Sequence, residues 1–116
     1  MPAPIVFFDI AGPDGAKQTA FYHEVFGWEI GPGGTLSVPL GGASLNGALR
    51  QDPSDKILYL GVDDVTAALA KVVAHGGKVI RPRFEVKGVV VLGLFTDPAG
   101  NSMGVVEMKN GKPVVP

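Results

Sequence analysis

Two halves of this chain repeat one another at a constant spacing of 50 residues, from Asp14 to Asp64 and from Gly27 to Gly77. In each half the Asp stands where a helix is predicted to begin, and the Gly opens a Gly-x-x-Ile segment. The same shift lays the apolar run 5–10 over residues 55–60. An internal period of this length indicates two copies of one structural unit, which restricts the fold more than composition does.

Each copy is predicted to fold as β-α-β-β-β. Asp and Gly are typical of helix starts and ends, and short β-branched runs between Gly and Pro clusters are typical of strands. The predicted strands are Ile5–Ile10, Trp28–Ile30, Thr35–Leu40 and Leu45–Leu49 in the first copy, and Lys56–Val62, Lys78–Glu85, Val89–Thr96 and Ser102–Met108 in the second. We expect a single domain over residues 1–116, with modules at about 1–50 and 51–108 and a loose tail at 109–116.

Apolar side chains at helical and strand spacing predict which faces are buried. In the first helix, Phe21, Tyr22, Val25 and Phe26 form one apolar face. Because successive strand side chains point to opposite faces, every second residue of the first strand of each copy should face a helix. The predicted helix-facing core is Phe8, Ile10, Leu58, Leu60, Val65, Leu69 and Val73.

Charge and composition exclude several functional classes. The net charge of −1 gives no electrostatic footprint for nucleic acid or for an anionic membrane. The sequence has no signal peptide pattern, and no run approaches the ~18 apolar residues of a membrane span. Cys is absent, which removes disulfides and thiol chemistry. We expect a cytoplasmic protein with a small-molecule partner and no nucleic acid or membrane partner.

Three segments carry a resemblance to a known family. They are Phe21–Glu29 (FYHEVFGWE), Val62–Val65 (VDDV) and Phe95–Asn101 (FTDPAGN). In this spacing, on a duplicated β-α-β-β-β unit, they resemble the vicinal oxygen chelate superfamily, the group of glyoxalases, bleomycin-resistance proteins and extradiol dioxygenases. The resemblance implies an α+β fold in which two βαβββ modules form an incomplete eight-stranded barrel, with two helices outside and a ligand in the concave cup. It also implies a homodimer.

The metal site that the resemblance implies lacks its ligands in this sequence. Metal-dependent members place a His on the first strand of each copy and a Glu on the last strand, because a divalent ion needs several converging N or O donors. We place these positions at Phe7, Ile57 and Gly104, and none of them offers a side-chain donor. His23 and His75 belong to the predicted helices and are expected at the surface. No metal and no cofactor are therefore expected.

Strand alternation predicts what the cup holds instead. If Phe7 and Ile57 point inward, so do Asp9 and Tyr59, which gives an apolar floor with one carboxylate and one phenol. Trp28 either lines the mouth of the cup or fills the core. The predicted ligand-binding residues are Phe7, Asp9, Trp28, Ile57, Tyr59 and Gly104.

The arginines have two interpretations. Arg50, Arg81 and Arg83 either hold an anionic ligand, because a guanidinium binds carboxylate or phosphate with two parallel hydrogen bonds, or they only solubilise strand ends.

Two functions follow, and they belong to different classes. The first is a metal-independent small-molecule-binding protein, similar to bleomycin-resistance proteins, which holds its ligand in the cup. The alternative is a lyase, isomerase or dioxygenase-like enzyme similar to glyoxalase I, either with Asp9 as a general base or with a metal site at positions other than the three named above. A scaffold with a filled cup is a third possibility.

Overall fold

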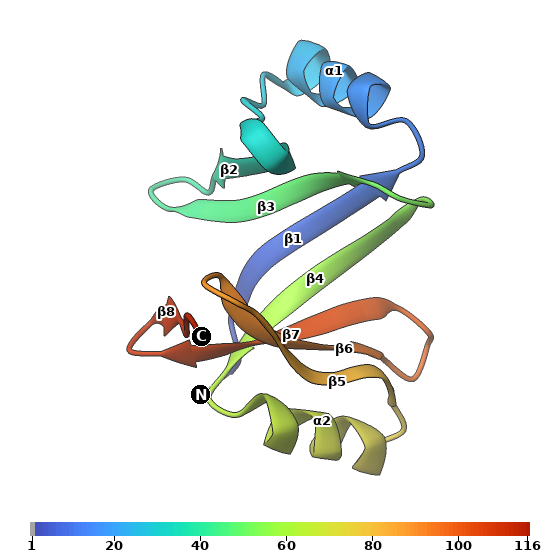
Figure 1. Ribbon diagram of the computed structural model, residues 1–116, viewed down its shortest axis with the longest axis vertical. Helices are drawn as coiled ribbons and strands as arrows, with labels where there is room; N and C mark the ends of the chain where they lie inside the picture. Colours follow the sequence, from blue (N-terminus) through green and yellow to red (C-terminus); the bar gives the residue numbers. More distant parts are fainter. Residues whose placement is uncertain (1) are drawn as a thin grey trace. The chain divides into compact units, whose positions relative to one another are not determined.

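The computed structural model of the protein describes residues 2–116 and confirms the α+β class (Figure 1). Within residues 2–116, two helices, one short 3-10 helix and eight strands follow one another. They are β1 (Ile5–Gly12), α1 (Gly15–Phe26), η1 (Pro32–Gly34), β2 (Thr35–Pro39), β3 (Ser44–Gln51), β4 (Asp55–Val62), α2 (Val65–Ala74), β5 (Lys78–Val86), β6 (Val90–Thr96), β7 (Ser102–Lys109) and β8 (Lys112–Pro113). No helix among residues 2–116 is long and apolar enough to cross a membrane.

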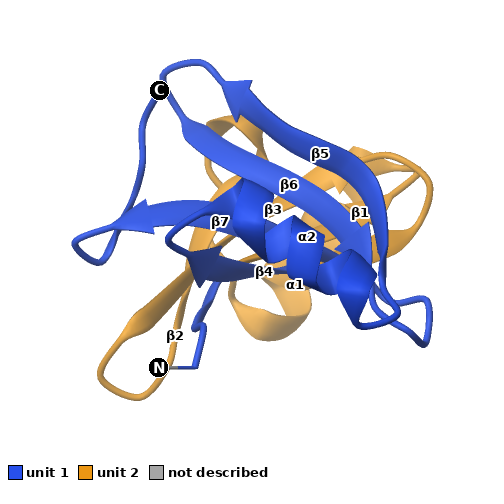
Figure 2. Cartoon of the chain, turned by 90° about the horizontal axis from the view of Figure 1, so that it is seen from below, with its two compact units in different colours: residues 1–6, 58–116 blue, residues 7–57 orange. Residues whose placement is uncertain are grey.

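The chain forms two compact units, which Figure 2 distinguishes by colour. One unit, orange in Figure 2, comprises Phe7–Ile57 and contains α1. The other, blue in Figure 2, comprises Leu58–Pro116 together with residues 2–6, and it contains α2. In each unit a helix packs on one face of a small sheet and leaves the opposite face without a helix.

In the unit Phe7–Ile57 the strand order is β2-β3-β1. β1 pairs with β3 in parallel, and β2 pairs with β3 antiparallel. The helix-side core consists of Phe8, Leu36 and Leu49, against which Tyr22 and Trp28 pack. Asp14 begins α1 as predicted, since its carboxylate accepts a hydrogen bond from the backbone N–H of Lys17 at 3.0 Å.

In the unit Leu58–Pro116 the strand order is β4-β7-β6-β5, and β8 pairs with β7. The helix-side core is the cluster Val65, Leu69, Phe95 and Val105. Asp64 caps α2 by accepting from the N–H of Ala67 at 2.9 Å. The predicted core residue Leu60 packs against this cluster, as Ile10 packs against the core of the other unit.

Two of the predicted strand and tail assignments are wrong. Trp28–Ile30 is not a strand: Gly27 adopts a left-handed conformation with φ of 71°, and the chain then turns into η1. Trp28 and Ile30 both pack on the Phe8 core rather than joining a strand ladder. The predicted loose tail contains β8 instead, and the N–H of Val114 extends its hairpin by donating to the carbonyl of Glu107 at 2.9 Å.

Parts of the predicted apolar faces are also exposed. Leu58 is 41% exposed and Val73 is 58% exposed, so neither belongs to the buried core. On α1 only Tyr22 packs against the core cluster, whereas Phe21, Val25 and Phe26 are exposed. Periodicity identified the apolar stripes, but a helix on a narrow sheet covers only the part of the stripe that lies directly over the strands.

Val65 and Val73, both on α2, allow a matched test of this core. Val65 is completely buried, so Val65→Ala removes two methyl groups from a closed cluster and should lower the free energy of unfolding by about 2 kcal/mol. Val73→Ala is the same change on an exposed residue, and it should alter the free energy by less than about 0.5 kcal/mol. Urea denaturation measures both. Equal losses in the two variants would contradict the assigned helix face.

Candidate functional site

The sheet face opposite α1 carries the first candidate site. Phe8 packs on the α1 side, so its strand neighbours Phe7 and Asp9 point to the opposite face. Register partners in a sheet share a face, which places Asn46 of β3 beside Phe7 and Ser37 of β2 beside Asn46. This face therefore combines an aromatic ring with an amide and a hydroxyl group.

An open pocket of about 350 Å³ lies on this face. Its lining residues are Phe7, Thr35, Leu36, Ser37, Asn46 and Gly47. An apolar surface with a few convergent polar groups is typical of small-molecule sites. The sequence prediction included Phe7 but missed Ser37 and Asn46, because their position depends on strand register rather than on any motif.

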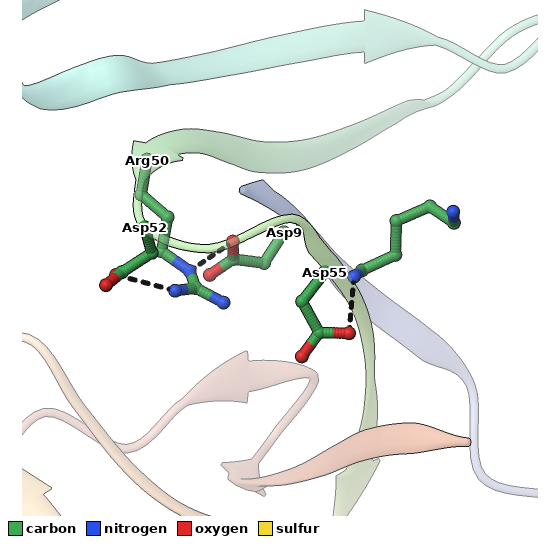
Figure 3. A network of polar contacts seen from close by, with 5 residues as sticks. Asp9, Arg50, Asp52 and Asp55 are labelled. Carbon is green, nitrogen blue, oxygen red and sulfur yellow. Dashed lines mark hydrogen bonds and ion pairs between the residues drawn. The ribbon is translucent and has the colours of Figure 1, made fainter. Parts of the chain in front are cut away.

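Asp9 is held by an ion pair on the same face. Its Oδ1 lies 2.7 Å from Nε of Arg50, and Nη1 of Arg50 lies 2.7 Å from Oδ2 of Asp52 (Figure 3). Arg50 thus lies between two carboxylates, so its main partners are within the chain. Arg50 was predicted either to hold an anionic ligand or to solubilise a strand end. The structure favours neither role, because the guanidinium of Arg50 binds and orients Asp9.

Burial dominates the electrostatics of Asp9. The residue is only 8% exposed, and this loss of solvent raises the pKa of its carboxyl above the usual value, although Arg50 acts in the opposite direction. The negative charges of Asp52 and Asp55 add to the rise. For Arg50, burial lowers the pKa, but the hydrogen bonds to Asp52 and Asp9 outweigh it and hold the pKa above its usual value. Asp9 is therefore a buried carboxyl with an increased tendency to bind a proton.

Tyr59 and Gly104 form a close pair in the unit Leu58–Pro116. They are register partners in β4 and β7, and Tyr59 is buried. A Cβ atom at Gly104 would overlap the Tyr59 ring, so the ring occupies the space that a side chain at position 104 would need. Gly104 therefore serves to admit the phenol ring. The predicted Ile57 is also buried, in the unit Phe7–Ile57.

Trp28 occupies the core, the second of its two predicted positions. Its ring stacks on Tyr22 with centroids 4.7 Å apart and contacts Phe8 at 5.7 Å, on the helix side of the sheet. The structure thus places Trp28 on the face opposite to Phe7 and Asp9. Its backbone carbonyl lies 2.9 Å from Nδ1 of His23, and this carbonyl, together with Glu29, raises the pKa of that exposed imidazole.

The described residues offer few metal donors. Within 2–116, no three His, Cys, Asp or Glu side chains gather closely enough to hold a metal ion. His23 lies exposed on α1, and His75 lies exposed at the end of α2. The positions at which the sequence predicts the family's metal ligands, Phe7, Ile57 and Gly104, hold two apolar side chains and a glycine beneath the Tyr59 ring.

The sequence matches a known domain family over most of its length. The glyoxalase-like domain matches residues 5–106, and the chain therefore belongs to the glyoxalase-like domain family. The resemblance to the vicinal oxygen chelate superfamily is thereby confirmed.

Two curated relatives extend this comparison. "Putative glyoxylase CFP32" from Mycobacterium bovis is 32% identical over 115 residues, which cover 84% of this chain and 42% of that protein. "Anthracycline biosynthesis protein DnrV" from Streptomyces peucetius is 27% identical over 128 residues, which cover 90% of this chain and 46% of that protein. The chain thus spans less than half the length of the curated relatives that it matches.

Solved structures show the same fold at low sequence identity. A methylmalonyl-CoA epimerase in complex with methylmalonyl-CoA and NH4+ has a TM-score of 0.67 at 16% identity, covering 98% of this chain and 100% of the epimerase. The methylmalonyl-CoA epimerase from Mycobacterium tuberculosis has a TM-score of 0.59 at 15% identity, covering 90% and 87% of the two chains. At this identity the likeness concerns the fold alone.

The raised pKa of Asp9 predicts a specific pH dependence of stability. The folded chain binds the Asp9 proton more tightly than the unfolded chain, whose Asp pKa is near 3.8, so this group's contribution is fully present below that pH. It should be lost as the pH rises through the raised folded pKa. The free energy of unfolding of the native chain minus that of Asp9→Asn should therefore fall as the pH rises from 3.8 toward neutrality. Urea denaturation across this range measures the difference, and a difference that grows with pH would mean that Arg50 outweighs burial.

Proposed function

We propose that this protein is a metal-independent small-molecule-binding member of the glyoxalase-like family. The observation that carries the proposal is the pocket on the face opposite α1, where Phe7 meets the polar groups of Ser37 and Asn46. The apolar ring provides contact area, and the amide and hydroxyl orient a ligand through hydrogen bonds. Asp9, fixed by Arg50, supplies a carboxylate on the same face.

The binding proposal extends to the residues predicted from the sequence. Phe7 and Asp9 are the proposed contacts that lie beside the pocket's polar groups. Ile57, Tyr59 and Gly104 remain proposed binding positions; Gly104 would act by leaving room for the Tyr59 ring. Trp28 would act only indirectly, by supporting Phe8 from the helix side.

Phe7→Ala tests the proposed pocket directly. Loss of the ring removes apolar contact and should weaken binding by roughly tenfold. Ligands are first found by thermal-shift screening of small aromatic and amphiphilic compounds, because a molecule that binds only the native state raises the melting temperature. Isothermal titration calorimetry then compares the variants. The matched control is Phe26→Ala on the exposed face of α1, and it should leave the affinity unchanged.

If Phe7→Ala and Phe26→Ala bind the ligand with equal affinity, the binding site does not lie on this face. Asp9→Ala should also weaken the binding of an uncharged or cationic ligand, since a charged hydrogen bond is worth about 1.5–3 kcal/mol. Lys17→Ala on α1 should have no effect on affinity.

Metal independence makes a separate prediction. Protein dialysed after purification should contain far less than one transition metal per chain, because the positions at Phe7, Ile57 and Gly104 supply no side-chain donors. Elemental analysis measures the content, and calorimetry in the presence of a chelator should give an unchanged ligand affinity. About one Zn, Ni, Fe or Mn ion per chain would contradict the proposal.

An enzymatic role is the second candidate, and Asp9 is the observation that favours it. Its raised pKa brings the carboxyl closer to the range of a general base or acid. The names of the relatives include a glyoxylase, and methylmalonyl-CoA epimerases share the fold. Asp9→Asn should abolish turnover of any substrate identified while it keeps most of the substrate affinity, whereas a pure binding protein shows no turnover to lose.

Assembly and location complete the proposal. We propose a cytoplasmic homodimer. The exposed Phe21, Val25 and Phe26 on α1 form an apolar surface that a second copy of the chain would cover. Light scattering would find twice the chain mass of 12.0 kDa for a dimer.

A further inference from the structure

Strand β5 departs from a regular strand on both sides of Arg81. Along its pairing with β6, Val79 pairs with Phe95, Arg81 with Leu94, and Phe84 with Leu92. From Val79 to Arg81, β5 advances two residues while β6 advances one. From Arg81 to Phe84, β5 advances three residues while β6 advances two. Each step inserts one extra residue into β5, so two bulges flank Arg81.

These bulges place Arg81 and Phe84 on the same face. In a regular strand, residues three apart point to opposite faces. Here the guanidinium carbon of Arg81 lies 3.6 Å from the centroid of the Phe84 ring. The extra residue between them turns the side chains of Arg81 and Phe84 to the same face. The stacked Phe84 ring then restricts rotation of the Arg81 guanidinium plane.

The shared face is the one opposite α2. Val79 packs in the α2 core, and a Cβ at Gly93 of β6 would meet the side chains of Leu69 and Val65 of α2. Leu92 and Leu94, on either side of Gly93, therefore point away from the helix. Since they are the register partners of Phe84 and Arg81, all four side chains lie on this face. Arg81 is thus an exposed cation whose neighbours on this face are apolar.

Arg81 differs from the other arginines in its partners. Arg50 pairs with Asp9 and Asp52, and Arg83 pairs with Glu85 and Glu107. Within residues 2–116, the only partner found for Arg81 is the Phe84 ring, which engages the flat side of the guanidinium. Its N–H groups, which lie in the guanidinium plane, have no carboxylate of the described chain to bind. A guanidinium fork matches a carboxylate in geometry and charge.

We propose that Arg81, held by Phe84, is a subsite for the carboxylate of a small apolar acid. The single cation fits a monoanion, and the half-buried Leu94 and Phe84 provide an apolar surface for the rest of the molecule. This inference rests on the proposed small-molecule function and adds the chemical class of one ligand group. It also assigns Arg81 the anion-holding role, while Arg50 and Arg83 are occupied within the chain.

A matched pair of probes tests the subsite, hexanoate and its neutral analogue hexanamide. Calorimetric titration of the intact protein should show hexanoate binding more tightly than hexanamide. Arg81→Gln should weaken hexanoate binding by roughly ten- to a hundredfold, the effect of losing a charge-assisted hydrogen bond, and should leave hexanamide unchanged. Lys87→Gln is the control, because it removes an exposed cation from the turn of the same hairpin. It should change neither affinity.

The outcomes separate this subsite from the proposed function. If hexanamide binds but hexanoate gains nothing, or if Arg81→Gln binds hexanoate as the native chain does, the carboxylate subsite is wrong and small-molecule binding stands. If Lys87→Gln loses as much affinity as Arg81→Gln, the attraction is a general charge effect and the subsite is also wrong. If neither probe binds and the thermal-shift screen finds no ligand, both proposals fail. As a second readout, the Nε–H signal of Arg81 in 15N-labelled protein should shift with hexanoate and not with hexanamide.

Discussion

Packing of a helix against one face of each sheet is the constraint on which the rest of the structure depends. Val65 and Leu69 close on Phe95 and Val105 in one unit, and Phe8 packs with Tyr22 and Trp28 in the other. Because strand side chains alternate, each buried residue fixes the direction of its neighbours. The helix-facing core thus decides which residues the opposite face can offer to a ligand.

Polar chemistry on those opposite faces is sparse and differs between the units. Around Phe7 it comprises an amide, hydroxyl groups and the Asp9–Arg50 pair. On the face of β5 and β6 it is one stacked arginine among leucines. Burial makes Asp9 depend on its partner Arg50, because a buried carboxylate needs a compensating charge. Arg81 is exposed, and its ring contact with Phe84 leaves its N–H groups able to bind an anion. Each of these faces, taken by itself, suits recognition of a small, mostly apolar molecule by a few fixed polar contacts.

Local signals in the sequence were sufficient for the features that depend on local physics. Asp14 and Asp64 cap helices because a short carboxylate accepts from free N–H groups, and Gly27 ends α1 because glycine accepts positive φ. Alternation in β1 correctly predicted that Phe8 and Asp9 point to opposite faces of the sheet.

The features that the sequence did not reveal depend on pairing between distant segments. Ser37 and Asn46 join Phe7 only through strand register, and β8 forms only because the end of β7, at Met108 and Lys109, extends beyond its pairing with β4 and β6. The two bulges in β5 interrupt the alternation of side-chain direction along that strand, so alternation does not predict its faces. Pro82 was the one local signal of an irregular strand.

The proposed function requires that the sheet face opposite α1 bind a small molecule without a metal. A ligand found by screening can be mapped onto 15N- and 13C-labelled protein by NMR in the presence of excess chelator. The largest shifts should occur at Phe7, Ser37 and Asn46, with little change at Phe21 and Phe26 of α1. Shifts concentrated on α1, or a ligand that the chelator releases, would contradict the proposed function.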